Sequence, residues 1–265
     1  MILIHVDVDN LWIYEKEYGI NLNIKKELIY LQSLPVLLGL LQKSNSKATF
    51  MIVAKDLNLP ACRSFCRRAI IQGHEISNHS LNHPISFAKL SKKKKIDEIK
   101  IAHELLTKVC GKKPVGFRGP GYFQDKDIIK VLNNLNYLYD SSVLPGVAQF
   151  LMSSYAFFKG GENKNKIFGS MNYLFQKQYP YILNRTKKNK VLLELPISVL
   201  PVIRLPIHTT FAYYFGRMYR NLIIKCLKLN TNYMLYLFHA IDFINLPKKT
   251  NHPIVNLRYS YNERI

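Results

Sequence analysis

The pattern of hydrophobic and polar positions along the chain alternates between two kinds of segment. Short apolar runs bounded by turn residues recur between longer stretches in which apolar side chains return every three or four positions. The short runs predict strands at 2–8, 48–54, 74–78, 115–118, 137–141, 191–197 and 233–238. The longer stretches predict helices at 25–43, 59–72, 91–110 and 125–135. This alternation predicts an α/β fold built on a parallel sheet or barrel.

The alternation lapses in the second half of the chain. Between residues 141 and 241, thirteen Lys and Arg accompany only two acidic residues, and aromatic side chains are dense. We expect a basic aromatic insertion at about 143–190 and a basic amphipathic segment at about 211–229. In that segment the bases near one helical face are Arg217, Arg220 and Lys228. Because no repeat, low-complexity tract or linker interrupts the chain, one domain is expected over 1–265.

Composition limits the function classes. With 265 residues, of which 48% are hydrophobic, the chain can bury a substantial core, which excludes a disordered protein. The net charge of +21 must attract phosphate, whether on nucleic acid, on an anionic lipid or on a charged substrate. The four cysteines are too scattered for a disulfide framework, so we expect reduced thiols, with a metal site at Cys62 and Cys66 as the alternative.

The N-terminus and the hydropathy pattern bear on location. The first nine residues contain two aspartates and neither a basic region nor an extended apolar one, so a signal peptide is not expected. No stretch approaches the ~18 to 20 apolar residues of a membrane span. These features predict a cytoplasmic protein.

Two aspartates close the first predicted strand. Asp7 and Asp9 stand two positions apart, so their side chains project from one face, at the strand end where parallel α/β folds place their sites. Carboxylates this close repel one another, and a metal on one of them would relieve the repulsion and leave the other available as a base. The alternative is a turn rich in aspartate that ends the strand.

Two histidines follow another predicted strand. His79 and His83 lie four positions apart, and one helical turn would bring both imidazoles to the same side. Taken singly, a histidine is more often structural than a ligand. Taken with the Asp-x-Asp pair at a separate strand end, the two histidines predict an Asp-His-His metal site with open positions for water and substrate.

The loop from Gly116 to Tyr122 follows a further predicted strand. Arg118 is suited to a bidentate contact with a carboxylate, and the backbone N–H groups around Gly121 and Tyr122 are suited to an oxyanion. The alternative is an ordinary loop with a surface arginine.

The last predicted strand delivers His239 to the same rim. His239 is suited to the role of general acid, with Asp242 or Glu194 orienting and charging its imidazole.

Together these motifs resemble those of the NodB-homology polysaccharide deacetylases, carbohydrate esterase family 4. The run Gly-His-Glu-Ile-Ser-Asn-His-Ser-Leu-Asn-His-Pro is the most specific, and Gly-Phe-Arg-Gly-Pro-Gly-Tyr, Tyr-Asp-Ser-Ser and Glu-Leu-Pro-Ile-Ser are also similar. The resemblance implies a distorted (β/α) barrel that removes acyl groups from sugars with a metal-bound water.

The resemblance also implies a role for each candidate residue. Asp7 would be the catalytic base, Arg118 its partner and His239 the general acid. The implied metal ligands are Asp9, His79 and His83. The implied cofactor is a divalent metal, for which Zn²⁺ is the leading choice and Co²⁺, Ni²⁺ and Mn²⁺ are alternatives.

The first motif departs from the usual family pattern. Val8 separates two aspartates that are adjacent in most members, which resembles the branch containing the ArnD deformylases. Those enzymes act on polyprenyl-phosphate-linked aminoarabinose. The tryptophan of the family's fourth motif has no counterpart here, because the only tryptophan is Trp12.

We therefore expect a metal-dependent hydrolase that removes an acetyl or formyl group from an amino sugar. The expected sugar is linked to polyprenyl phosphate in envelope glycan or lipopolysaccharide modification, with the protein peripheral on the inner face of the membrane and in contact with anionic lipid. Alternatives are a deacetylase of a soluble or polymeric glycan such as peptidoglycan and a member that only binds glycans. The distant alternative is a nucleic-acid-binding protein. Nucleic-acid binding would leave the four motifs unexplained, so no nucleic-acid partner is expected.

Overall fold

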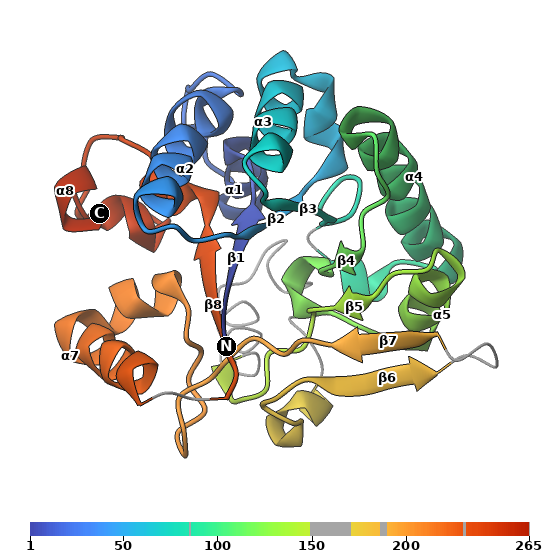
Figure 1. Cartoon of the computed structure of the whole chain (residues 1–265). Coiled ribbons are helices and arrows are strands. Elements are labelled where there is room, and N and C mark those ends of the chain that lie inside the picture. The colour runs from blue at the N-terminus through green and yellow to red at the C-terminus, as the bar shows by residue number, and fades with distance from the viewer. Residues whose placement is uncertain (85, 149–170, 186–189, 230–231, 265) are drawn as a thin grey trace.

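The computed structural model describes residues 1–84, 86–148, 171–185, 190–229 and 232–264. Its centre is one curled sheet of eight strands in the order β6-β7-β5-β4-β3-β2-β1-β8 (Figure 1). The strands are β1 (Ile2–Val8), β2 (Thr49–Ile52), β3 (Glu75–Asn78), β4 (Gly116–Phe117), β5 (Tyr139–Asp140), β6 (Tyr181–Arg185), β7 (Val191–Glu194) and β8 (Met234–His239).

All neighbouring strands are parallel except β6 and β7, which are antiparallel. The register therefore aligns the carboxyl ends of the parallel strands. Asp7 of β1 pairs with His239 of β8, and Asp140 of β5 pairs with Glu194 of β7. Polar residues that follow these strands meet at one edge of the sheet, which is where α/β folds place their sites.

The helices lie around the outside of the curled sheet (Figure 1). They are α1 (Leu11–Tyr18), α2 (Leu34–Lys43), α3 (Pro60–Ile71), α4 (Lys92–Cys110), α5 (Lys126–Asn134), α7 (Thr209–Lys228) and α8 (Tyr261–Arg264). Shorter turns complete the described structure: the π-helical turn η1 (Ile29–Ser33) and the 3₁₀ turns η2 (Ala54–Asn58), η3 (Phe87–Lys89), η4 (Pro120–Tyr122), η6 (Met171–Phe175), η7 (Ala240–Phe243) and η8 (Val255–Arg258).

The largest part of the core lies between the sheet and α2, α3 and α4. Phe50 of β2 packs edge to face on Phe65 of α3, and Leu106 of α4 belongs to the same buried cluster. A capping residue stands at each end of α4. The hydroxyl of Ser91 accepts the backbone N–H of Lys94, and Gly111 ends the helix in the left-handed conformation.

The strand and helix pattern of the first 140 residues follows the sequence prediction, with ends shifted by a few residues. The main difference is the helix expected at 25–43, which becomes the π-helical turn η1 followed by α2. Helix α1 was not predicted. It begins at Leu11, and the side chain of the preceding Asn10 caps it by accepting the N–H of Leu11.

The second half of the chain contains an unpredicted strand. β6 pairs only with β7 and is largely exposed, so it lacks the apolar run that marks a buried strand. Helix α7 lies where the basic amphipathic segment was expected, with an interruption at Gly216 (φ 71°). Much of the basic aromatic insertion expected at about 143–190 lies outside the described residues.

Candidate metal and catalytic site

Four strand ends bring the candidate residues together. Asp7 and Asp9 come from the end of β1, and His79 follows β3. Arg118 follows β4, and His239 is the last residue of β8. All of these side chains are buried or nearly so, which gives their charges and lone pairs much more influence on each other than they would have in water.

Asp9, His79 and His83 form the tightest group of ligand atoms. The Nε2 atoms of both histidines lie 3.5 Å from Oδ1 of Asp9, and the three ligand atoms lie within 4.8 Å of one another. Oδ1 of Asp9 is buried and has no hydrogen-bond donor. An acceptor without a donor, facing two imidazole nitrogens, is an unfavourable arrangement for a protein alone and a favourable one for a protein with a cation.

The tautomer of His79 fits a metal ligand. Its Nδ1 lies 2.7 Å from the carbonyl oxygen of Arg118, and because a carbonyl can only accept, Nδ1 carries the proton. Burial lowers the pKa of His79 to about 3, so the ring is neutral. The Nε2 lone pair is therefore directed toward Asp9, with its proton held on the far side of the ring, as metal-binding histidines generally require.

The same burial shifts the pKa of Asp9 in the opposite direction, upward. Burial raises its pKa to about 8, against the opposing influence of His239, because an ionised carboxylate is costly to bury beside Asp7. A divalent cation would remove that cost. The donor set of one carboxylate and two imidazoles fits Zn²⁺ and related divalent ions, and it leaves positions open for water and substrate.

A loop rather than a helical turn delivers His83, so the helical geometry expected from the spacing of the histidines was wrong. Ser80 and His83 both adopt the left-handed conformation, and the hydroxyl of Ser80 accepts the backbone N–H of His83. The rings of His79 and His83 consequently meet edge to face, 4.9 Å apart.

Glu98 of α4 holds this loop in place and was not singled out from the sequence. Its Oε2 accepts the backbone N–H groups of Leu81 (3.0 Å) and Asn82 (2.8 Å), and its Oε1 accepts the amide of Asn82 (2.8 Å). Nothing in the local pattern around Glu98 distinguishes it from the other charged residues of that helix, because its partners lie sixteen and seventeen positions earlier in the chain.

Arg118 is fully buried and holds Asp7. Its Nη1 donates to Oδ1 of Asp7 at 2.6 Å, its Nη2 lies 2.9 Å from Nδ1 of His5, and its Nε donates to the carbonyl of Ser141 at 2.8 Å. The hydroxyl of Ser141 also accepts from Nη2. Burial alone would raise the pKa of Asp7, but the charge and hydrogen bond of Arg118, together with the nearby His79 and His239, outweigh burial and hold that pKa well below its usual range. Asp7 is therefore ionised, with Oδ2 as its free oxygen.

His239 faces both aspartates. Its Nε2 lies 3.9 Å from Oδ2 of Asp7 and 3.6 Å from Oδ2 of Asp9. The carboxylates expected to orient this ring do not bond to it. Asp242 accepts the backbone N–H of His239 (2.9 Å), while Glu194 accepts from the backbone of Val143 and the amide of Gln124. Asp242 therefore positions the backbone at His239, and Glu194 belongs to a neighbouring polar cluster with Asp140.

The proposed oxyanion donors also differ from expectation. The backbone N–H of Tyr122 donates to the carbonyl of Gly119 at 3.0 Å, so this donor is already used in closing the turn η4. Gly121 in that turn has φ 64°, a conformation that favours glycine. The hydroxyl of Tyr122 lies 3.3 Å from Nε2 of His208, the residue that directly precedes α7.

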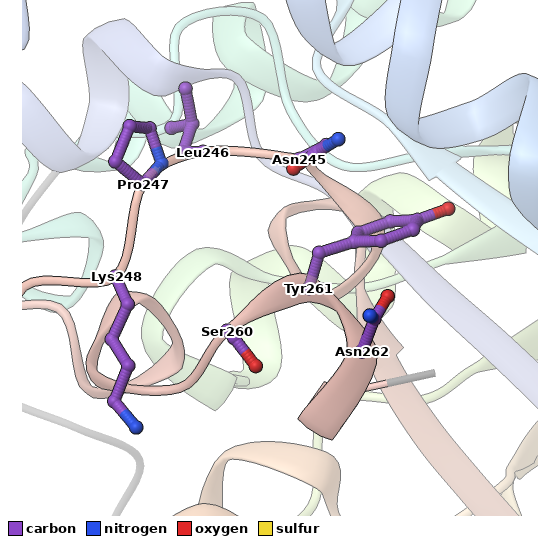
Figure 2. Close-up of a pocket in the computed structure, with 7 residues that line it drawn as sticks. All are labelled: Asn245, Leu246, Pro247, Lys248, Ser260, Tyr261 and Asn262. Carbon is purple, nitrogen blue, oxygen red and sulfur yellow. The ribbon is translucent and has the colours of Figure 1, made fainter.

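A separate hollow of ≈ 360 Å³ lies at the C-terminal end of the described chain (Figure 2). It is lined by Asn245, Leu246, Pro247, Lys248, Ser260, Tyr261 and Asn262. None of these residues belongs to the metal or catalytic group, so the hollow adds nothing to that chemistry. The four cysteines are free, and no cysteine cluster for a metal occurs among the described residues.

Comparisons with known proteins give one family match and several similar folds. Residues 29–139 match the family Polysaccharide deacetylase. A solved structure from Mycobacterium smegmatis, assigned as a polysaccharide deacetylase, is similar over 99% of this chain and 80% of its own, with a TM-score of 0.59 and 19% identity. Another, from Pseudomonas aeruginosa PAO1 and assigned in the same way, covers 90% of this chain and 77% of its own, with a TM-score of 0.57 and 13% identity. No curated protein matches the sequence.

The structural similarities confirm the distorted (β/α) barrel expected from the sequence, with the sheet open between β6 and β8 in the described part of the chain. The family match includes His79, His83 and Arg118. Asp7, Asp9 and His239 lie outside the matched segment, and the sheet brings them to it.

Proposed function

We propose that this chain, which matches the polysaccharide deacetylases over residues 29–139 and shares their fold, is a metal-dependent hydrolase that removes an N-acyl group from an amino sugar. The observation that carries the proposal is the unpartnered Oδ1 of Asp9, 3.5 Å from Nε2 of both His79 and His83. Asp9, His79 and His83 would hold the ion. When bound, a divalent ion supplies Lewis acidity, which polarises a carbonyl and lowers the pKa of water from ~15.7 toward ~7.

Asp7 is the proposed catalytic base. Oδ1 is occupied by Arg118, so a proton would be accepted at Oδ2, the oxygen nearer to Nε2 of His239. The low pKa of Asp7 keeps it ionised at every working pH. It also means that Asp7 holds a proton only weakly and can pass it on.

His239 is the proposed general acid. Its Nε2 lies 3.9 Å from Oδ2 of Asp7, which is close enough for a small rearrangement or one water to carry a proton between them. Protonated His239 would then donate to the nitrogen of the leaving amine. The side chain is the most exposed of the catalytic group, at 14%, which suits a residue that meets substrate.

Two features support a lipid-linked amino sugar as the substrate. The spacing Asp7-Val8-Asp9 resembles the ArnD-like branch, whose members act on polyprenyl-phosphate sugars and remove a formyl group. Helix α7 supplies the second feature. Its outer face exposes the apolar residues Met218 (86% exposed), Leu222 and Leu229 (68% exposed), which are spaced to form one stripe.

Bases accompany this apolar stripe. The exposed bases of α7 are Arg217, Lys225 and Lys228, and the helix contains no acidic residue. An apolar stripe flanked by bases is typical of a helix that lies on an anionic membrane surface. No helix in the described part of the chain is long and apolar enough to cross a membrane. The proposed association is therefore peripheral.

The direct test is hydrolysis of N-acetyl and N-formyl amino sugars, free and linked to polyprenyl phosphate, in the presence of Zn²⁺. Mass spectrometry should find loss of one acyl group, and Asp7→Asn should abolish it while the protein still binds zinc. Circular dichroism on the variant separates loss of the base from loss of the fold. Absence of acyl release from all four substrates by folded, zinc-loaded protein would contradict the proposal.

A further inference from the structure

His208 is a buried histidine next to the proposed general acid. It directly precedes α7, and its backbone pairs with Leu237 of β8, two residues before His239. The centroids of the His208 and His239 rings lie 4.7 Å apart, with their planes inclined by 43°. No other described residue forms a ring contact with His239 at this distance.

The hydrogen bonds of His208 define its tautomer. Its Nδ1 accepts the backbone N–H of Thr210 at 2.8 Å, which caps the first turn of α7. That nitrogen must therefore carry the lone pair. Burial lowers the pKa of His208 well below its ordinary value, and the neighbouring His239 lowers it further, so the ring is neutral with its single proton on Nε2.

The remaining proton points at the loop after β4. Nε2 of His208 lies 3.3 Å from the hydroxyl oxygen of Tyr122, so the imidazole donates to the tyrosine. His208 thus makes contact with three separate elements: the N-terminus of α7, the turn η4 through Tyr122, and β8 through His239. A rigid neutral ring in this place limits the orientations that His239 can adopt.

We propose that His208 is a positioning residue for the general acid His239: its Nε2–H bond to Tyr122 holds the His208 side chain against the His239 ring. The role rests on the proposed function, because it concerns how His239 is presented to the leaving amine. Since His208 is held neutral, it packs against His239 without placing a second positive charge beside the protonated ring. His208 itself transfers no proton.

Two substitutions test the two hydrogen bonds of the His208 imidazole separately. In His208→Asn the side-chain oxygen occupies the place of Nδ1, so it can still cap α7, but it cannot reach Tyr122. In His208→Gln the amide N–H reaches the place of Nε2, so the bond to Tyr122 is kept while the cap is weakened. We expect His208→Asn to lower kcat about tenfold or more with unchanged KM, zinc content and Tm. We expect His208→Gln to recover most of kcat and to lose ~2–4 °C in Tm.

His252 provides a matched control. It is also buried, and its Nδ1 also accepts the backbone N–H two residues later, from Ile254 at 3.1 Å. His252→Asn therefore repeats the same local change away from His239 and should keep the wild-type kcat. Equal kcat in wild type and His208→Asn, or equal losses in His208→Asn and His208→Gln, would overturn the proposal.

A readout independent of activity separates this proposal from the proposed function. The side-chain NMR resonances of His239 should broaden or split in His208→Asn, because the ring can then adopt several orientations, and should form one sharp set in His208→Gln as in the wild type. Line shape is compared because both variants lose the ring current of His208, 4.7 Å away, which moves the resonance positions in either case. That pattern would support the positioning role even if no acylated sugar were hydrolysed. Equal line shapes of the His239 resonances in His208→Asn and His208→Gln would overturn it, whatever the activity of the wild-type protein.

Discussion

Arg118 and Asp7 lie 111 positions apart in the chain, yet Nη1 of the one donates to Oδ1 of the other at 2.6 Å in a fully buried setting. The other nitrogens of the guanidinium are bonded to Ser141 and His5, so its orientation is fixed from several sides. Removing one member of such a pair leaves the other charge buried and uncompensated, which typically costs ~3–5 kcal/mol.

We predict that Arg118→Lys lowers both stability and turnover. A lysine carries the charge but cannot bond to Asp7, Ser141 and His5 at once, because its three donors share one atom. We expect a loss of stability smaller than the ~3–5 kcal/mol above, because lysine keeps the positive charge, and a fall in kcat of ~10²-fold or more. Urea unfolding and acyl release measure the two effects. The control is Lys92→Met, which removes the exposed ion pair with Asp127 and should match wild type.

Zinc binding should depend on pH through Asp9. Its pKa of about 8 means that the metal-free carboxyl is protonated below that pH, and a proton on Asp9 competes with the ion. The pKa of His79 is lowered to about 3, so this ligand does not compete in the same range. Zinc affinity should therefore rise about tenfold per pH unit from pH 6 to pH 8 and then level off.

The same experiment can follow the variants of the site. Trp12 is the only tryptophan, and its indole N–H donates to Asp56 at 2.9 Å. Its fluorescence therefore comes from a single environment and can be followed during a zinc titration. Metal analysis after dialysis gives the number of zinc ions bound per chain. His83→Ala should lose bound zinc, whereas His103→Gln, which alters a buried histidine on α4, should keep it. Stoichiometric zinc in His83→Ala would remove that residue from the proposed ligands.

Glu98 should control metal affinity without touching the metal. It accepts three hydrogen bonds from the segment Leu81–Asn82 that connects the two histidine ligands. We expect Glu98→Ala to weaken zinc binding ~10–100-fold, as loss of supporting contacts around metal ligands generally does. Glu98→Gln should be milder, because its carbonyl oxygen can still accept the two backbone donors.

Competition with a chelating dye measures this effect. Asp97 is the adjacent exposed acid on α4, and Asp97→Ala changes the net charge by the same amount as Glu98→Ala. If Asp97→Ala and Glu98→Ala weaken zinc binding equally, long-range charge rather than the loop contacts would account for the change.

The proposed contact with a membrane predicts a dependence on lipid charge. The protein should sediment with vesicles that contain anionic lipid and not with neutral vesicles at low salt. Arg217→Gln, Lys225→Gln and Lys228→Gln together should weaken that binding, since these are the exposed bases of α7 and each base near the surface contributes ~1 kcal/mol. Hydrolysis of a short soluble analogue should be unchanged.

A matched charge control uses helix α4. Lys93, Lys94 and Lys100 are exposed on that helix, and their replacement by glutamine removes the same net charge. Equal loss of binding in both triple variants would show that total charge, rather than α7, governs the interaction. Indifference of the wild-type protein to vesicle charge would favour a soluble sugar substrate.

Much of the fold and of the candidate site can be predicted from sequence because parallel strands bring their carboxyl ends to one edge. Asp9, His79 and Arg118 each follow a recognisable apolar run, so their proximity needs no knowledge of side-chain packing. The contacts that set the chemistry of these residues cannot be predicted in the same way. His5 and Ser141 bond to Arg118 because the register of the strands brings β1 and the end of β5 to it. No feature of the sequence around either residue predicts that contact.

The backbone geometry of two loops also differs from what the sequence predicts. The spacing of His79 and His83 suits a helical turn, but the left-handed Ser80 and His83 give the same proximity by another path. The backbone N–H of Tyr122 closes its own turn. Both outcomes depend on φ angles that residue identity only weakly restricts outside glycine and proline.

Pairing of β1 with β8 has a consequence for biosynthesis. The ribosome completes Asp9, His79 and His83 within the first third of the chain, and β1, β2 and β3 can then pair with one another. His239 emerges some 160 residues later, which at ~5–20 residues per second is a delay on the order of ten seconds. A nascent chain would therefore contain all three proposed metal ligands well before β8 docks beside β1. Binding of the proposed metal and completion of the proposed catalytic group would then be separate events in the life of each molecule.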